Sequence, residues 1–253
     1  MDAFTLKMIA IISMGIQHTT WIFWEIIPIW LHIPLYVMRG ITFPIMAYFL
    51  TEGYRHTSNV KKYMMRLLIF ALIAQIPYVF ATGIYTLNII FTILIGLICL
   101  EQYENLYVRE KRVGLFVAVF LALSIISFIS EGGMFCIILI LLFHLIKDEK
   151  NRRVIPLICW GFFMLIPNLI YRVLNFLDMT TSVGIMDMLY DVQIIGVQVE
   201  LLMLQFYVFS IGSFLIIPFL NAYNGEIGRN AKYLFYAFYP LHWIVLSLIA
   251  YFI

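Results

Sequence analysis

The chain has 253 residues, of which 64% are hydrophobic and only 12% are charged, and its mean hydropathy is +0.98. These values exclude a soluble domain, whose apolar share is normally near half. The net charge of +2 is too small to indicate a nucleic-acid partner, and the three cysteines lack the spacing of a disulfide framework or a metal site. Composition therefore predicts a polytopic membrane protein without a metal.

About nine apolar runs follow one another, each near the roughly 20 residues that a helix needs to cross a bilayer core. We place them at 5–24, 33–51, 64–82, 85–100, 113–130, 133–147, 154–173, 200–220 and 234–253. Some runs are short enough to be tilted, partial or re-entrant, so a count of ten stays open. The runs lack the alternation of a membrane β-barrel, and backbone groups in lipid must be paired within their own segment. The sequence predicts an all-α helix bundle that forms a single transmembrane domain over 1–253.

The first run contains the stretch "GIQHTTWIF", in which His18 is an ionisable group inside an apolar segment. Lys7 precedes it by almost three complete helical turns, so both side chains fall on one stripe of the predicted helix. Lys7 would lie at the cytoplasmic mouth, with His18 roughly 16 Å deeper along the same line. A ligand with phosphates could be held by Lys7 while its reactive end reaches the imidazole. A histidine that only hydrogen-bonds within the bundle is the alternative.

The second run, within "VMRGITFPIMAYFLTEGYRHT", carries a basic side chain at Arg39. A guanidinium cannot lose its charge to escape burial, so Arg39 must face a polar cavity. Gly40 permits close packing against another helix, and Pro44 predicts a kink. Glu52 and His56 lie one turn apart at the predicted cytoplasmic end. They form either a surface ion pair or part of the entrance for the ligand that carries the phosphates.

Lysine and arginine are confined to alternate connections between the runs. The cations are Arg55, Lys61, Lys62 and Arg66, then Arg109, Lys111 and Arg112, then Lys147, Lys150, Arg152 and Arg153, and finally Arg229 and Lys232. The intervening connections, "EIIPIWLHI", "ATGIYTLN", "SEGG" and 174–199, contain neither residue. Because cytoplasmic loops carry the excess of lysine and arginine, this alternation places the N-terminus in the cytoplasm and the C-terminus outside.

The long connection 174–199 carries Asp178, Asp187 and Asp191. An ordinary outward acidic loop and an acceptor-binding element are the two interpretations of this segment.

The last run holds a second intramembrane histidine, His242, after Pro240 in "FYPLHW". A proline interrupts the backbone hydrogen bonding of a span, which is tolerated where a cavity wall forms. His242 is therefore a candidate for orienting the acceptor or the base, and a structural histidine is the alternative. Trp243 lies near the end of this run, where tryptophans are typical interface anchors.

Five ordered blocks resemble the motifs of one known family. They are "LKMIAIISMGIQHT", "RGITFPIMAYFLTEGYRHT", "RLLIFALIAQIPY", "NIIFTILIGL" and "FYPLHW". In this order they are similar to TraX, the acetylase family associated with conjugative pilin. TraX proteins in turn resemble the wider acyltransferase-three superfamily, which moves acetyl groups from cytoplasmic acetyl-CoA to acceptors at or across the membrane. That superfamily's basic residue, ten intervening residues and histidine correspond to Lys7 and His18.

Two positions depart from the family pattern, which usually has an acid before the first histidine and another before the Ile-Pro of the third run. Here these positions hold Gln17 and Gln75. A cationic amine is the acceptor that would most need those acids, so the resemblance leaves the identity of the acceptor open.

The resemblance and the residues together imply a mechanism of acetyl transfer. His18 would act as the base, and Arg39 would stabilise either the developing oxyanion or a phosphate. The cations that would hold the phosphates of CoA are Lys7, Arg55, Lys61, Lys62 and Arg66. The side chains that would bind or orient the acceptor are Gln17, Glu52, His56, Gln75, Asn88 and His242.

We therefore expect a multi-pass acetyltransferase of the bacterial cytoplasmic membrane that uses acetyl-CoA. Its acceptor would be a peptide N-terminus, a pilin-like subunit or a glycan hydroxyl. A transporter or flippase would also place histidine, arginine and glutamate inside the bundle, but it should show internal repeats or paired broken helices, which the sequence lacks. A non-catalytic membrane partner descended from an acetylase is the other alternative.

Overall fold

A computed structural model describes residues 1–181, 199–229 and 232–252 of the chain. The acidic residues Asp187 and Asp191, which carry the hypothesis of an acceptor-binding element, lie outside the described residues. The helix before them continues to Thr181, so the connection begins later than the predicted residue 174.

The described residues form helices joined by short connections and contain no strand, which confirms the predicted all-α class. The helices are α1 (Ala3–Ile22), α2 (Ile29–His56), α3 (Val60–Thr82), α4 (Ile89–Gln102), the π-helix η1 (Tyr103–Arg109), α5 (Val113–Ser127), α6 (Gly133–Leu145), α7 (Glu149–Arg152), α8 (Ile155–Thr181), α10 (Val199–Leu215), α11 (Ile217–Asn221) and α12 (Lys232–Phe252). Each predicted apolar run overlaps one of these helices, except that 200–220 is divided between α10 and α11.

Five stretches of helix among the described residues are long and apolar enough to cross a membrane. They are Trp30–His56, Val60–Thr82, Ile89–Arg109, Glu149–Phe176 and Leu234–Phe252. The helices α5 and α6 are apolar but shorter. The chain is thus a helical membrane protein, while the nine-span count and the cytoplasmic N-terminus stay predictions.

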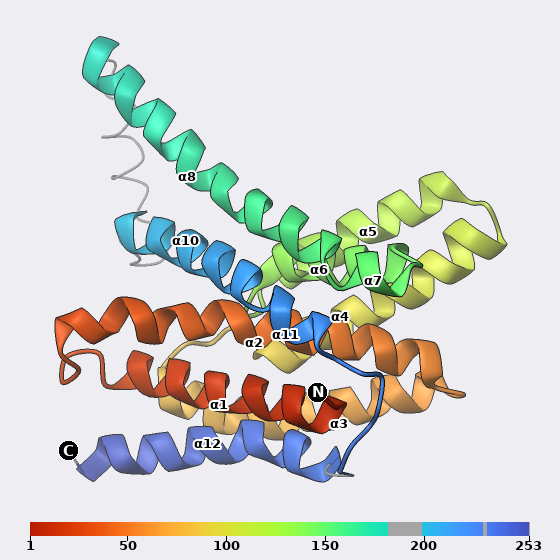
Figure 1. The fold of residues 1–253 in the computed structure, drawn as a ribbon, viewed down its shortest axis with the longest axis horizontal. Helices are drawn as coiled ribbons and strands as arrows, with labels where there is room; N and C mark the ends of the chain where they lie inside the picture. The colour runs from red at the N-terminus through yellow and green to blue at the C-terminus, as the bar shows by residue number, and fades with distance from the viewer. Residues whose placement is uncertain (182–198, 230–231, 253) are drawn as a thin grey trace.

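The helices pack side by side along a common direction (Figure 1). The helix α2 contacts α1 on one side and α10 on the other, and α12 contacts α3. The helix α4 packs between α3 and α6. Figure 1 shows the far half of α8 leaning away from the rest of the bundle.

Local sequence sets several helix ends. The Asp2 carboxylate accepts a hydrogen bond from the Thr5 amide at 2.8 Å and so begins α1. The Asn59 side chain accepts from the Lys62 amide at 2.8 Å at the start of α3. These side chains satisfy amides that the first turn of a helix leaves without intrahelical partners. Gly83 ends α3 with a φ of +67°, a left-handed conformation that glycine adopts without steric cost.

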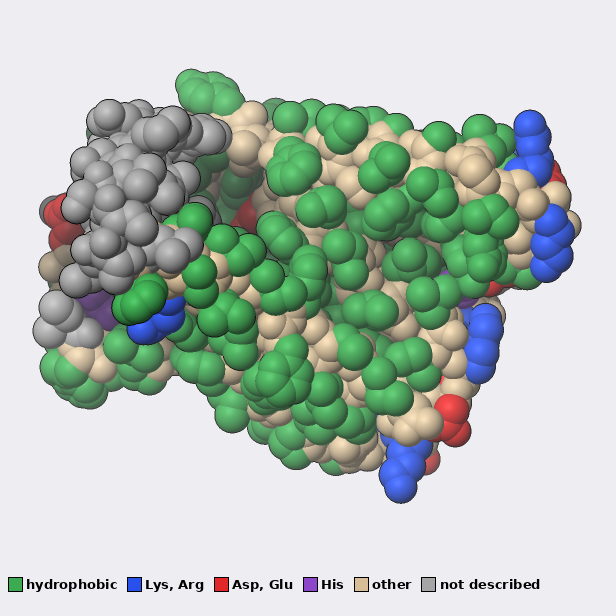
Figure 2. Space-filling model, turned by 90° about the horizontal axis from the view of Figure 1, so that it is seen from above, with side chains coloured by type: hydrophobic (Ala, Val, Ile, Leu, Met, Phe, Trp, Pro, Cys, Tyr) green, Lys and Arg blue, Asp and Glu red, His purple; other side chains and the backbone are tan. Residues whose placement is uncertain are grey.

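The charged side chains gather mainly at one end of the molecule. Figure 2 shows hydrophobic side chains over most of the visible face and Lys and Arg side chains mostly at the end where α2 meets α3 in Figure 1. This gathering is what the alternation of lysine and arginine along the chain predicts, and we call it the basic end.

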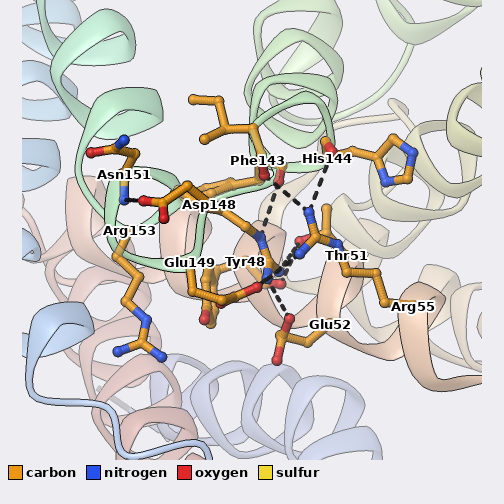
Figure 3. A network of polar contacts seen from close by, with 12 residues as sticks. Tyr48, Thr51, Glu52, Arg55, Phe143, His144, Asp148, Glu149, Asn151 and Arg153 are labelled. Atoms are coloured by element: carbon orange, nitrogen blue, oxygen red, sulfur yellow. Dashed lines mark hydrogen bonds and ion pairs between the residues drawn. The ribbon is translucent and has the colours of Figure 1, made fainter.

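A fully buried arginine ties helices together at the basic end. Arg152 has no exposed side-chain area and lies 2.6 Å from the Glu52 carboxylate and 2.9 Å from that of Glu149. Its other nitrogens donate to the Thr51 hydroxyl at 3.0 Å and the Phe143 carbonyl at 3.1 Å. Figure 3 shows Thr51, Glu52 and Glu149 gathered around this network. The sequence had offered Arg152 only as a loop cation that sets topology, so its structural role is a finding of the fold.

A close helix crossing joins α2 to α10 through two glycines, Gly40 and Gly212. A Cβ atom at Gly212 would lie 2.3 Å from the Cα of Gly40, and a Cβ at Gly40 would lie 2.5 Å from the Val208 carbonyl oxygen. Small residues let helix backbones approach in a membrane, where van der Waals packing drives helix association. Gly40 therefore permits close packing as predicted, and the residue that it packs against is Gly212.

Replacing Gly212 by alanine should destabilise the protein by about 1–3 kcal/mol, because the new methyl group would overlap the backbone of α2. The measurement is the midpoint of thermal unfolding in detergent. Gly114→Ala is the control, since nothing lies within 4 Å of a Cβ there and alanine favours helix. Equal midpoints for the two variants would contradict the close crossing.

Candidate functional site

A cavity of about 630 Å³ lies inside the bundle and is lined by residues of α1, α2, α3, α4, α6, α10 and α12. Lys7, His56 and Arg66 line it at the basic end, and His18 lines it along α1. Because Lys7 and His18 are almost three turns apart on one helix, the cavity extends roughly 16 Å from Lys7 to the imidazole. The structure therefore places Lys7 at the basic end of the cavity, which we call its mouth, and His18 deeper in the bundle along the same helix.

The imidazole of His18 is held by a second histidine. His18 is 2% exposed, and its Nδ1 lies 2.7 Å from Nε2 of His242. The Nδ1 of His242 lies 3.0 Å from the Phe238 carbonyl oxygen, which can only accept, so this Nδ1 carries the proton. The neutral His242 ring then accepts at Nε2, and His18 donates from Nδ1. This pattern leaves a lone pair on Nε2 of His18.

Aromatic rings fix the plane of the His18 imidazole. The ring of Trp243 lies 4.2 Å from it and the ring of His242 lies 4.9 Å from it, centroid to centroid. Trp243 is fully buried, so the prediction that it anchors the chain at the membrane interface is wrong. The reason is that α12 turns this face toward α1, and packing against His18 removes the indole from the surface.

Glu131 faces the free nitrogen of His18. Its Oε1 lies 4.0 Å from His18 Nε2, beyond hydrogen-bond distance, and Tyr239 donates from its hydroxyl to Oε2 at 3.4 Å. The Glu131 amide donates to the Leu87 carbonyl at 2.7 Å, and Gly132 follows with a φ of +91°. The turn between α5 and α6 is therefore folded against the start of α4, inside the bundle.

Sequence reasoning missed Glu131 because it assigned "SEGG" to an outward connection. The structure shows that this connection folds into the bundle, since Glu131 and Gly132 line the same cavity as His18, while its outward side stays a prediction. The signal was present in the short run 133–147 and in the glycine pair directly after the acid. Two glycines allow the left-handed turn that brings the carboxylate inward.

Arg39 also lines the cavity, half-buried on α2. Its guanidinium lies over the Phe209 ring at 5.5 Å, and its positive charge acts on both His18 and Glu131. Three groups that can hold charge or move a proton thus meet at one end of the cavity. The role of Arg39 in stabilising an oxyanion or a phosphate stays a prediction.

Three cations line the mouth of the cavity: Lys7, Arg66 and Arg229. Lys7 lies over the Phe49 ring at 4.8 Å, and Arg66 lies over the Tyr63 ring at 5.5 Å. The Nε of Arg66 is buried and has no hydrogen-bond partner among the described residues. Arg229 was noted in the sequence only as a topology signal, because its loop and α1 are far apart in the chain.

Three predicted CoA-binding cations lie away from the cavity lining. Lys61 and Lys62 are exposed in the first turn of α3. Arg55 forms an ion pair with Glu149 at 2.9 Å and donates to the Ile146 carbonyl at 3.1 Å. Its charge is thus used to hold α2 to the end of α6, which explains why it does not face the mouth.

Glu52 and His56 both line the cavity, but they do not form the expected ion pair with each other. The Glu52 carboxylate pairs with Arg152, while Nδ1 of His56 lies 2.9 Å from the Glu52 carbonyl oxygen. Of the two interpretations, a place in the cavity wall is the one that the structure favours.

Gln75 and Asn88 bind each other outside the cavity lining. The Asn88 amide group donates to Gln75 Oε1 at 2.9 Å and to the Ala71 carbonyl at 2.8 Å. The Gln75 amide group donates to the Thr86 carbonyl at 2.8 Å. These bonds hold the start of α4 against α3. Gln17, in contrast, is buried in the cavity wall beside His18.

The chain is similar in sequence to one known protein family and to one curated protein. The family model described as TraX protein matches residues 3–250. The probable fimbrial assembly protein FimC, serogroup H1, of Dichelobacter nodosus is 28% identical over 258 residues, which cover 95% of this chain and 92% of that protein. No solved structure matches the chain significantly.

Proposed function

Because the chain belongs to the TraX family, we propose that it is an integral membrane acetyltransferase involved in the assembly of a pilus or fimbria. It would move an acetyl group from cytoplasmic acetyl-CoA to an amine or hydroxyl of a membrane-associated or exported acceptor, with a pilin-like subunit as the first candidate. The observation that carries this proposal is the contact between His18 and His242, which leaves His18 Nε2 facing Glu131 in a cavity that also contains Arg39.

His18 is the general base of the proposed reaction. The donor brings an acetyl group that is already activated as a thioester, so the protein must supply a base, an electrostatic partner and orientation. His18 Nε2 removes the proton from the acceptor as its nitrogen or oxygen bonds to the acetyl carbon. His242 is a positioning residue, because its Nε2 accepts from His18 Nδ1 and so fixes which nitrogen of His18 is free.

Arg39 stabilises the negative charge that develops on the acetyl oxygen. A preorganised cation inside the bundle acts more strongly than it would in bulk solvent. As the carbon–sulfur bond breaks, His18 returns its proton to the departing thiolate, so the imidazole ends the cycle neutral. All atoms are accounted for by the acetylated acceptor and free CoA.

The mouth of the cavity suits the phosphates of CoA. Lys7, Arg66 and Arg229 meet there from α1, α3 and the loop before α12, and the buried Nε of Arg66 offers a donor that the described residues leave unused. Cations that donate hydrogen bonds are the usual partners of phosphate. The depth of roughly 16 Å between Lys7 and His18 separates the phosphate end of the donor from its reactive end.

Replacing Arg66 and Arg229 together by glutamine should weaken acetyl-CoA binding by roughly a hundredfold or more, because each lost charge-assisted hydrogen bond is worth about 1.5 kcal/mol or more. Binding to the intact protein should also weaken as salt is added. The measurement is equilibrium binding in detergent at two salt concentrations. Lys61→Gln with Lys62→Gln is the matched control, since it removes the same charge at the same end outside the cavity lining. Equal losses in the two double variants would contradict this assignment of the mouth.

Release of free CoA from acetyl-CoA by the purified protein tests the proposed reaction. The assay follows the thiol with a colorimetric reagent, with and without an added acceptor mixture prepared from cell envelopes. We expect a slow release that the acceptors accelerate. Folded protein that binds acetyl-CoA but releases no CoA under either condition would favour the non-catalytic partner.

A further inference from the structure

We propose that Glu131 is the acceptor-binding residue that makes the site prefer a nucleophile with two hydrogens on the reacting atom, a primary amine, over a hydroxyl. This inference rests on the proposed acetyl transfer and adds to it the residue that selects the acceptor.

The geometry between Glu131 and His18 carries the argument. Two hydrogen-bond acceptors, His18 Nε2 and Glu131 Oε1, face each other across 4.0 Å. A nitrogen or oxygen atom of the acceptor can lie at about 2.8–3.0 Å from both. A hydroxyl has one hydrogen, so it can satisfy only one of the two, and its lone pair would then oppose the other. A primary amine has a hydrogen for each.

The same geometry assigns the two hydrogens different fates. The hydrogen that points to His18 leaves as the nitrogen bonds to the acetyl carbon and the carbon–sulfur bond breaks. The hydrogen that points to Glu131 stays on the nitrogen of the amide product. Glu131 therefore binds the acceptor throughout, and the amine reacts in its neutral form, which has the lone pair that bonds to the acetyl carbon.

The position of the Glu131 carboxylate is fixed from several sides. Tyr239 donates to Oε2, which leaves Oε1 turned toward His18. Hydrogen bonds from the Glu131 amide to Leu87 and from the Thr92 hydroxyl to the Glu131 carbonyl hold the backbone of the turn. Because the His18 imidazole and the Glu131 carboxylate are already in place, binding of the acceptor costs no free energy for ordering them. The two groups therefore discriminate between acceptors by the hydrogen bonds that each acceptor can donate.

Competition between two small acceptors tests this role. Purified protein and acetyl-CoA are incubated with equal amounts of n-hexylamine and n-hexanol, and the ratio of the hexylacetamide and hexyl acetate products is measured by mass spectrometry. In Glu131→Ala this ratio should fall by roughly ten- to a hundredfold, the worth of one hydrogen bond to a charged group. Glu131→Asp draws the carboxylate back by about one carbon–carbon bond, ~1.5 Å, and should lower the ratio as well.

Glu104→Ala is the matched control. Glu104 lies 2.6 Å from His144, a comparable contact between an acid and a histidine, and it is absent from the cavity lining. The ratio of hexylacetamide to hexyl acetate formed by Glu104→Ala should equal that of the intact protein. Acetyl transfer with an unchanged ratio in both Glu131→Ala and Glu131→Asp would overturn the inference while leaving the proposed function standing. Failure of the intact protein to acetylate either acceptor, together with no release of CoA, would instead overturn the proposed function.

Discussion

Replacing His18 by alanine should lower the rate of acetyl transfer by roughly two to four orders of magnitude, the usual contribution of a positioned general base. Acetyl-CoA should still bind, because the cations that hold it lie at the mouth of the cavity and not beside His18. The rate of the intact protein should also fall at acid pH as His18 Nε2 takes up a proton, and this decline should be absent in the variant.

The contact with His242 makes a second variant necessary. His18→Ala removes the donor to His242 Nε2, and a buried acceptor left without its donor costs about 1–3 kcal/mol. His18→Asn can keep this hydrogen bond through its side-chain amide while lacking a base. His32→Ala is the control, since His32 contacts the Ile27 carbonyl and does not line the cavity. Acetyl transfer by His18→Asn at near the intact rate would show that this histidine is structural.

Replacing Arg152 by alanine should destabilise the protein by about 3–5 kcal/mol, the usual cost of removing one partner from a buried ion pair. The change leaves the Glu52 carboxylate, which faces Arg152 at 2.6 Å, without its cation in the wall of the cavity. It also removes the donors to Thr51 and Phe143, so α2 loses the polar link to α6 that runs through Arg152. The measurement is the midpoint of thermal unfolding in detergent.

Two further variants distinguish the effect of removing a buried, paired charge from the effect of removing any positive charge. Lys150→Ala removes a neighbouring cation that is exposed, and such a change should shift the midpoint little. Arg152→Met combined with Glu52→Gln removes both charges and should recover part of the lost stability, because no unpaired charge remains buried. An Arg152→Ala protein that unfolds together with Lys150→Ala would contradict the described network.

The helical architecture was predictable from the sequence because it depends on local pattern. Runs of apolar residues of bilayer length must become helices, since lipid offers no partner for backbone groups. The ends of the helices were harder to predict from the sequence. For example, α2 begins at Ile29 and ends at His56, and so extends beyond the predicted run 33–51 on both sides. A polar end of a helix that packs on its neighbours does not stand out in hydropathy.

The candidate site was predictable where one helix carries the information. Lys7 and His18 share a stripe of α1, and an arginine inside an apolar helix implies a cavity, so these residues could be placed by spacing and charge alone. The contact of His18 with His242 joins positions 224 residues apart, and no local pattern indicates it. Glu131 was hidden for a related reason, since only packing against α4 turns its loop inward.

The cations show a different limit of the sequence. Positive charge at the predicted cytoplasmic end follows from topology, but the same charge serves three purposes in the structure. Arg66 lines the mouth, Lys61 and Lys62 are exposed, and Arg152 is buried in a network. Only the arrangement of helices around each side chain distinguishes these purposes, because all four residues carry the same charge and belong to connections that the sequence assigns to the same side of the membrane.

Comparative mass spectrometry of envelope proteins and glycans tests the central claim most directly. The cells compared would contain the intact gene, no gene, or the gene for His18→Asn. The account predicts an acetyl group on a pilin-like or other envelope acceptor in the first cells and its absence in the other two. The same acetylated species in all three, with His18→Asn inserted in the membrane at normal amounts, would contradict it.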